Sequence, residues 1–137
     1  PTAGNGCNRS TMTDKPHVHH LDDVAWETRP GRTDGVRWKL LIDSDRTPSH
    51  SLSLGILQFP PGTVLAPHHH GPQEIYWIRE GTGEVLIDGK KQNVRPNSII
   101  YIPENQVHGI ENIGTTPLTL MWVFPTDTWG EVEYLFE

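Results

Sequence analysis

Short apolar runs alternate with segments rich in polar residues, glycine and proline along most of the chain. The runs lie at residues 36–43, 51–59, 74–79, 84–87, 98–102, 118–124 and 131–136. Runs of this length between turn residues are typical of β-strands. Asp88-Gly89 is a hairpin signal, and the turns at 60–62 and 95–97 close other strands. The pattern predicts an all-β barrel or sandwich, with at most a helical turn at residues 21–27, and the number of strands fits a jelly roll.

Side chains at even spacing along a strand share one face. If the turn at Gly71-Pro72 keeps this parity, His69, Ile75 and Trp77 face one way. The even-numbered residues then face the interior together: His68, His70, Glu74 and Tyr76. The sequence therefore predicts a cluster of ligand-type side chains inside the barrel.

A distant segment, residues 97–112, adds His108 to this cluster. Three imidazoles and one carboxylate suit one divalent transition metal such as Fe, Ni, Mn or Zn. Four protein ligands leave two open positions on an octahedral ion, which favours a catalytic site over a closed structural one. The alternative is a set of unrelated surface histidines with Glu74 a solvated charge, but Glu74 opens an apolar run where an unpaired carboxylate is costly.

Both segments resemble the two motifs of the cupin superfamily. The first begins at Gly62, ends at Gly81 and fits at every defined position. The second fits at Pro103, His108 and Asn112. It departs from the pattern where the family usually has glycine, at Asn97 and Asn105; asparagine tolerates left-handed backbone, so the turns should survive. The resemblance implies a cupin double-stranded β-helix with His68, His70, Glu74 and His108 as metal ligands.

A more specific resemblance covers nearly everything from residue 35 to the C-terminus. The segments 35–43, 51–55, 74–76, 122–127 and 131–134 resemble the small single-domain cupin lyases of the Ddd type, which cleave dimethylsulfoniopropionate (DMSP). This resemblance implies a metal-dependent carbon–sulfur lyase. Its zwitterionic substrate would be split into dimethyl sulfide and acrylate by β-elimination.

Such an elimination needs a base near the carbon next to the substrate carboxylate. Tyr76 lies two residues after Glu74 on the same face and is the candidate base. A free tyrosine has a pKa of about 10, and an adjacent divalent cation can stabilise its phenolate. Tyr134 is the second candidate near the substrate, as an auxiliary acid/base or hydrogen-bond donor. The alternatives are a hydrogen-bonded core residue for Tyr76 and simple packing for Tyr134.

Two tryptophans, Trp38 and Trp122, are candidates for binding the sulfonium group, because an aromatic face attracts a cation that lacks hydrogen-bond donors. They could also be ordinary core residues. Arg37 and Lys39 flank Trp38 and share the opposite face. A role for Trp38 inside the barrel therefore excludes one for Lys39.

Three other functions are compatible with the same residues. An Fe(II)-dependent cupin dioxygenase would use the same ligands and would consume oxygen. A sugar or keto-acid isomerase is another small-molecule enzyme of this fold. A non-enzymatic ligand-binding cupin would need only the barrel.

The length of 137 residues predicts one domain, at residues 16–137, preceded by a tail at residues 1–15 that is disordered or foreign to the natural protein. The net charge of −6 without a basic stripe argues against nucleic acid and anionic membranes as partners. Neither a membrane span nor a signal sequence is apparent. With Cys7 as the single cysteine, a cytoplasmic protein is expected. Outward residues such as Ile75 and Trp77 favour a homodimer.

Overall fold

The computed structural model describes residues 13–137, so the predicted tail lies almost wholly outside the described part. The described chain is almost entirely β-structure, with two short 3₁₀ helices, η1 (Leu21–Asp23) and η2 (Trp129–Glu131). The strands are β1 (Arg37–Ile42), β2 (Ser53–Phe59), β3 (Val64–His69), β4 (Glu74–Glu80), β5 (Gly83–Ile87), β6 (Lys90–Val94), β7 (Ile99–Ile102), β8 (His108–Asn112), β9 (Leu118–Phe124) and β10 (Leu135–Phe136). The predicted all-β class is confirmed. From residue 13 onward, the helices are too short to cross a membrane.

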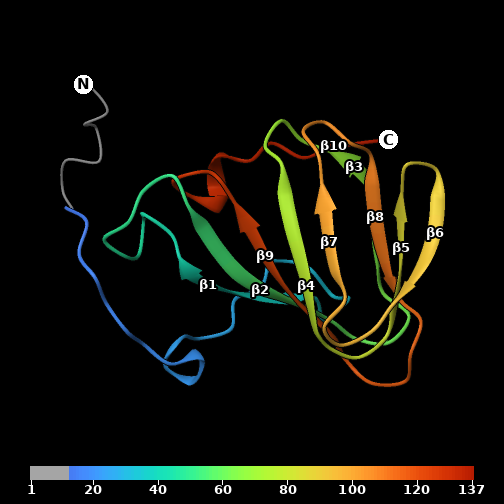
Figure 1. The fold of residues 1–137 in the computed structure, drawn as a ribbon. Coiled ribbons are helices and arrows are strands. Elements are labelled where there is room, and N and C mark those ends of the chain that lie inside the picture. The colour runs from blue at the N-terminus through green and yellow to red at the C-terminus, as the bar shows by residue number, and fades with distance from the viewer. Residues whose placement is uncertain (1–12) are drawn as a thin grey trace.

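The strands form two antiparallel five-stranded sheets (Figure 1). One sheet has the order β1-β2-β9-β4-β7, and the other has the order β10-β3-β8-β5-β6. Both sheets contribute to one buried cluster, which includes Phe59, Ile78, Ile102, Leu118, Leu120 and Phe124 from the first sheet and Val85, Val94 and Ile110 from the second. This is the jelly-roll arrangement, in which two sheets enclose one core.

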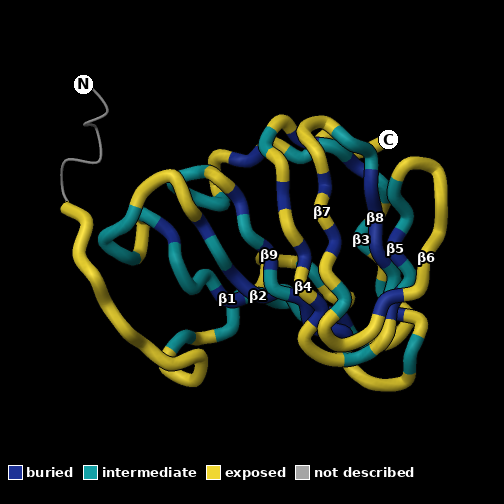
Figure 2. The backbone as a smooth tube through the Cα atoms, in the orientation of Figure 1, coloured by how far each residue is buried: buried dark blue, intermediate teal, exposed yellow. Residues whose placement is uncertain are grey.

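Strand β4 shows how polar side chains come to face the interior of the barrel. Its burial alternates residue by residue, as the bands along β4 in Figure 2 show. Glu74 and Tyr76 are buried, whereas Ile75 and Trp77 are 38% and 39% exposed. The predicted parity is confirmed along β4, and it directs Glu74 and Tyr76 into the barrel.

The turns behave as their residue types predict. Asp88 and Gly89 have positive φ angles of 53° and 71° and connect β5 to β6 as a hairpin. Asn97 and Asn105 also lie in the left-handed region, at 73° and 60°. Asparagine therefore adopts left-handed backbone at both positions, as the sequence predicts. At Gly81, by contrast, φ is +82° and an added Cβ would lie 2.3 Å from the Pro117 carbonyl oxygen, so glycine is required.

Three strands were not predicted from the sequence, and one predicted strand is largely wrong. The sequence pattern gave no strand for β3, β6 or β8. The predicted strand at residues 131–136 is wrong over most of its length, because Thr128 and Glu131 form a capping box that starts η2 and leaves only the short β10. The predicted helical turn at 21–27 is present only as η1.

Candidate metal centre

The four candidate ligands come from three strands and one turn at the same end of the barrel. His68 belongs to β3, His70 follows it, Glu74 opens β4 and His108 opens β8. Pairing of β3 with β8 places His68 directly opposite His108. All four side chains are buried, and one ring nitrogen from each histidine lies within 4.8 Å of the other two. The fold therefore brings together the set that parity and the motifs predicted.

Backbone carbonyls fix which nitrogen of each histidine faces the cluster. The Nδ1 atoms of His68, His70 and His108 each lie 2.8 Å from a backbone oxygen, of Ala66, Pro72 and Gln106 respectively. A carbonyl oxygen only accepts hydrogen bonds, so each Nδ1 carries the hydrogen and donates. Each Nε2 is then left with a free lone pair. Metal-binding histidines are oriented in this way by the partner of their other nitrogen.

These lone pairs converge on a carboxylate rather than on donors. Oε1 of Glu74 lies 3.1 Å from Nε2 of His70 and 3.5 Å from Nε2 of His108. Nε2 of His68 and of His108 are buried and have no hydrogen-bond partner among the described residues. Buried acceptors facing one another are costly unless a cation lies between them. The donor set therefore fits a divalent metal ion, and three imidazoles with one carboxylate suit Fe, Ni, Mn or Zn.

Burial makes protonation of His68 unfavourable. It lowers the pKa of His68 from 6.5 to about 4, although the Ala66 carbonyl acts in the opposite direction and the neighbouring histidines lower the pKa further. In the unfolded chain the same imidazole binds a proton near its ordinary pKa of 6.5. The folded state is thus favoured fully only above that pH.

We expect the metal-free protein to lose stability as the pH falls from about 6.5 to about 4. Protonation of His68 in the unfolded chain would lower the free energy of unfolding by on the order of 3 kcal/mol over this range. Urea denaturation of chelator-treated protein across the range measures the change. In the His68→Gln variant, the free energy of unfolding should fall less over the same pH range, because the titrating imidazole is absent. An equal fall in the variant would contradict the attribution to His68.

Tyr76 lies beside the cluster and is almost completely buried. Its ring meets that of His108 edge to face, at a centroid distance of 5.9 Å. Its hydroxyl has no hydrogen-bond partner among residues 13–137. Burial, then the charge of Glu74 and the presence of Tyr134, raise the pKa of Tyr76 well above its ordinary value. A phenolate at this position therefore needs a compensating positive charge close by.

Tyr134 reaches the cluster from the C-terminal segment. Its ring stacks on His68, with centroids 4.8 Å apart and planes 14° from parallel. Its hydroxyl accepts a hydrogen bond from Nε1 of Trp129, at 3.1 Å. Burial and the charge of Glu74 raise the pKa of Tyr134, and this hydrogen bond opposes them. Tyr134 is therefore a protonated phenol at neutral pH.

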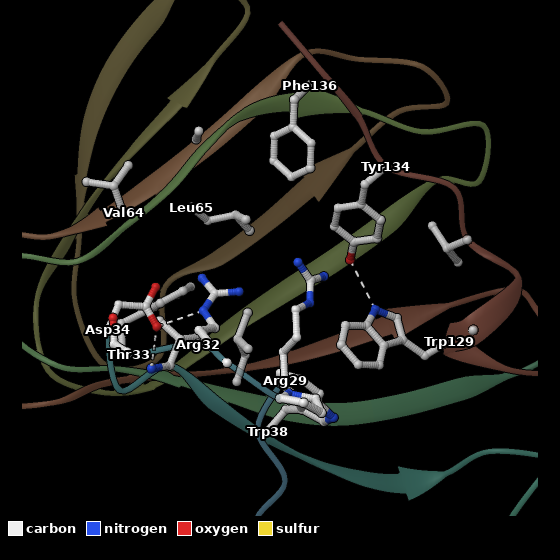
Figure 3. Close-up of a pocket in the computed structure, with 18 residues that line it drawn as sticks. Arg29, Arg32, Thr33, Asp34, Trp38, Val64, Leu65, Trp129, Tyr134 and Phe136 are labelled. Atoms are coloured by element: carbon white, nitrogen blue, oxygen red, sulfur yellow. Dashed lines mark hydrogen bonds and ion pairs between the residues drawn. The ribbon is translucent and has the colours of Figure 1, made fainter.

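A cavity of about 970 Å³ opens beside Tyr134 (Figure 3). Aromatic side chains form one wall: Trp38, Trp129, Tyr134 and Phe136. The segment at residues 29–34 forms the mouth, where Arg32 is paired with Asp34 at 2.7 Å. Figure 3 shows the Arg29 guanidinium directed into the cavity. The cavity thus combines aromatic faces, which attract cations, with a positive charge at its entrance, which attracts anions.

The two tryptophans predicted to bind the sulfonium, Trp38 and Trp122, lie differently with respect to the cavity. Trp38 lines the cavity. The neighbouring Lys39 lies on the opposite face of the sheet and is buried there, where its Nζ donates to the Leu21 carbonyl at 3.0 Å and lies over Trp26. Trp122 is buried and does not line the cavity; its ring lies 5.0 Å from that of Trp129. Sequence reasoning missed Trp129. The capping pair Thr128 and Glu131 was the available signal, because it stops the chain from continuing as a strand.

Comparison with known proteins gives consistent results. The profile of the family described as Cupin domain matches residues 55–124. The dimethylsulfoniopropionate lyase DddW of Ruegeria pomeroyi is 35% identical over 125 residues, which cover 88% of this chain and 82% of that protein. KdgF from Halomonas sp. has a similar structure, with a TM-score of 0.69 and 20% identity, over 81% of this chain and 94% of that one. A chain from the crystal structures of the DMSP lyases RdDddP and RnDddQII gives a TM-score of 0.67 and 18% identity, over 83% of this chain and 62% of that one. The two structural similarities show the fold alone.

Proposed function

The chain belongs to the cupin family, and we propose that it is a metal-dependent lyase that cleaves DMSP into dimethyl sulfide and acrylate. One observation carries the proposal. A buried tyrosine without a hydrogen-bond partner, Tyr76, stands beside a metal-binding cluster in a chain that matches DddW over most of its length. The cluster supplies a place for the substrate carboxylate, and Tyr76 supplies a group that can take a proton.

The elimination is redox-neutral, and its atoms and electrons balance. The proton on the carbon next to the carboxylate passes to the base, its electron pair forms the new double bond, and the carbon–sulfur bond breaks to release neutral dimethyl sulfide. A divalent cation bound by the cluster would polarise the carboxylate and supply the positive charge that favours a phenolate at Tyr76. Water is largely excluded, because Tyr76 and the four ligands are all buried.

Tyr76 is the residue that we propose as the base. It shares the inner face of β4 with Glu74, so the proton acceptor and the ligand set are held on one rigid strand. The unbonded hydroxyl is free to meet the substrate. A positioned general base contributes about 10²- to 10⁴-fold to a rate.

Substrate binding is assigned to the aromatic wall of the cavity. We assign the sulfonium to the face of Trp38, whose ring packs edge to face with that of Trp129 at a centroid distance of 5.0 Å. Trp122 supports this wall by contacting Trp129 from behind. The carboxylate end would then lie toward the histidines, past Tyr134. Arg29 at the mouth helps to attract that carboxylate on entry.

We expect turnover of DMSP to be independent of oxygen. The elimination transfers no electrons to an acceptor, so rates measured in air and under argon should agree, and several divalent metals should support the reaction. Headspace gas chromatography of protein reconstituted separately with Fe, Ni, Mn and Zn tests both statements. Substrate loss coupled to oxygen uptake would instead identify a dioxygenase.

We also propose that the protein forms a homodimer through the outer face of the first sheet. Apolar side chains form two cross-strand rows there: Leu54, Val123, Ile75 and Tyr101 in one, and Met121, Trp77 and Ile99 in the other, which continues to the buried Ile56. A flat face of this kind suits a second copy of itself, as a two-fold axis requires. Sedimentation equilibrium should give a dimer for the native chain and a monomer for Trp77→Glu/Ile99→Glu. A native monomer would contradict the proposal.

A further inference from the structure

Trp129 connects the aromatic wall of the cavity to Tyr134. Its indole nitrogen donates a hydrogen bond to the Tyr134 hydroxyl oxygen at 3.1 Å, drawn as a dashed line in Figure 3. Its ring also contacts the rings of Trp38 and Trp122, each at a centroid distance of 5.0 Å. The contacts place one residue between the wall that lines the cavity and the tyrosine that stacks on His68.

The backbone around Trp129 is held firmly. Its main-chain N–H donates to Oδ2 of Asp43 at 3.0 Å, and this carboxylate is 2% exposed. The capping box of Thr128 and Glu131 fixes the turn that contains Trp129. Ser44 N–H also donates to the Asp127 carbonyl at 2.9 Å. A buried carboxylate and a capped turn together fix the position of the indole, which is what a positioning residue requires.

The polarity of the hydrogen bond determines what Tyr134 can do. An indole N–H donates and never accepts, so the Tyr134 oxygen must be the acceptor. The hydrogen of the Tyr134 hydroxyl must then point elsewhere, and no described residue accepts it. Since Tyr134 lines the cavity, the hydrogen is available to a bound ligand.

We propose that Trp129 is a positioning residue that makes Tyr134 a hydrogen-bond donor to a carboxylate oxygen of the substrate. This inference rests on the proposed function for the identity of the carboxylate. The role differs from that of Tyr76, whose hydroxyl has no N–H donor holding it among the described residues. The proposed site then has one tyrosine beside the histidines to take a proton, Tyr76, and one that lines the cavity to hold the substrate, Tyr134.

A double-mutant cycle tests whether Trp129 acts through Tyr134. Trp129→Phe should raise KM for DMSP about fivefold with little change in kcat, as expected for loss of one hydrogen bond that supports binding. In a Tyr134→Phe background, the same substitution should change kcat/KM by less than about twofold. If the effects of the two substitutions on kcat/KM multiply, Trp129 acts on the substrate independently of Tyr134, as part of the cavity wall. That result would overturn the proposal.

Trp77→Phe is the matched control. It removes an indole N–H that donates to Oδ1 of Asn97 at 3.2 Å on the outer face of the sheet, away from the cavity. Its KM should equal that of the unmodified protein in both backgrounds. A fivefold effect from this control would show that loss of any indole hydrogen bond disturbs the enzyme, and would remove the support for Trp129.

A second measurement does not depend on turnover. The chain has three tyrosines, so ¹³Cζ-tyrosine labelling gives three resonances, which Tyr→Phe variants assign. Trp129→Phe should shift the Tyr134 resonance and leave that of Tyr101 unchanged. Propionate added to zinc-loaded protein should shift the Tyr134 resonance and bind about fivefold more weakly to Trp129→Phe. A Tyr134 resonance that responds to neither change would overturn the inference, whereas a normal response without DMSP turnover would reject only the proposed substrate.

Discussion

Tyr76→Phe should bind metal normally and yet lose most of its turnover. Phenylalanine keeps the ring and its packing, including the edge-to-face contact with His108, and removes only the hydroxyl. Loss of a positioned general base should lower kcat by about 10²- to 10⁴-fold. Initial rates of dimethyl sulfide release, with metal content measured by atomic absorption on the same samples, test this expectation.

Tyr101→Phe is the control for this substitution. Tyr101 is exposed, and its hydroxyl donates to Oε1 of Gln73 at 2.6 Å, away from the interior. Loss of this hydroxyl should leave kcat within about twofold, because the Tyr101 side chain lies on the outer face of the first sheet, opposite the buried Tyr76 and the ligands. Near-normal turnover by Tyr76→Phe would eliminate Tyr76 as the base.

The pH dependence gives a further check on Tyr76. The phenolate is the active form of the proposed base, and burial and Glu74 raise its pKa, so less of the active form is present at neutral pH. The rate should therefore increase as the pH rises through neutrality. Any residual activity of Tyr76→Phe should lack this increase.

The second large effect is expected for His108→Ala, which should lose metal and activity together. His108 supplies one of the three converging Nε2 atoms, and no other described side chain can take its place. We expect metal binding to weaken by more than about 100-fold, since even indirect partners of metal ligands contribute 10- to 100-fold. Added metal should raise the melting temperature of the unmodified protein and leave that of His108→Ala unchanged.

His69→Ala is the matched control for the ligand assignment. His69 lies between two of the ligands in sequence but faces the other way, with its Nε2 4.0 Å from a carboxylate oxygen of Glu137. This variant should retain full metal content. If His69→Ala lost metal as His108→Ala does, the parity argument that separates His68 and His70 from His69 would fail.

The site was predictable from sequence because its ligands follow simple rules. The parity of His68, His70, Glu74 and Tyr76 put them on one face, and the structure buries all four. His108 lies on a distant strand that the apolar pattern did not predict, and the resemblance to a known motif implied that it is the fourth ligand. The asparagines at 97 and 105 were correctly expected to adopt left-handed backbone.

Other features were not predictable, for physical reasons. Strand β3 contains Pro67 and a register irregularity between Leu65 and His68, so its pattern does not alternate. Strand β6 is an edge strand that pairs only with β5, and its mostly exposed residues give no apolar run. The role of Trp129 depends on a hydrogen bond across a turn to Tyr134, which no periodicity in the sequence records.

The most direct test of the central claim is the stoichiometry of products formed from DMSP by metal-reconstituted protein under anaerobic conditions. Dimethyl sulfide would be measured by headspace gas chromatography and acrylate by liquid chromatography of the same sample. The proposed elimination predicts equal amounts of the two products, formed without oxygen. Absence of both products with each of Fe, Ni, Mn and Zn would contradict the assignment of DMSP as the substrate of this metal centre.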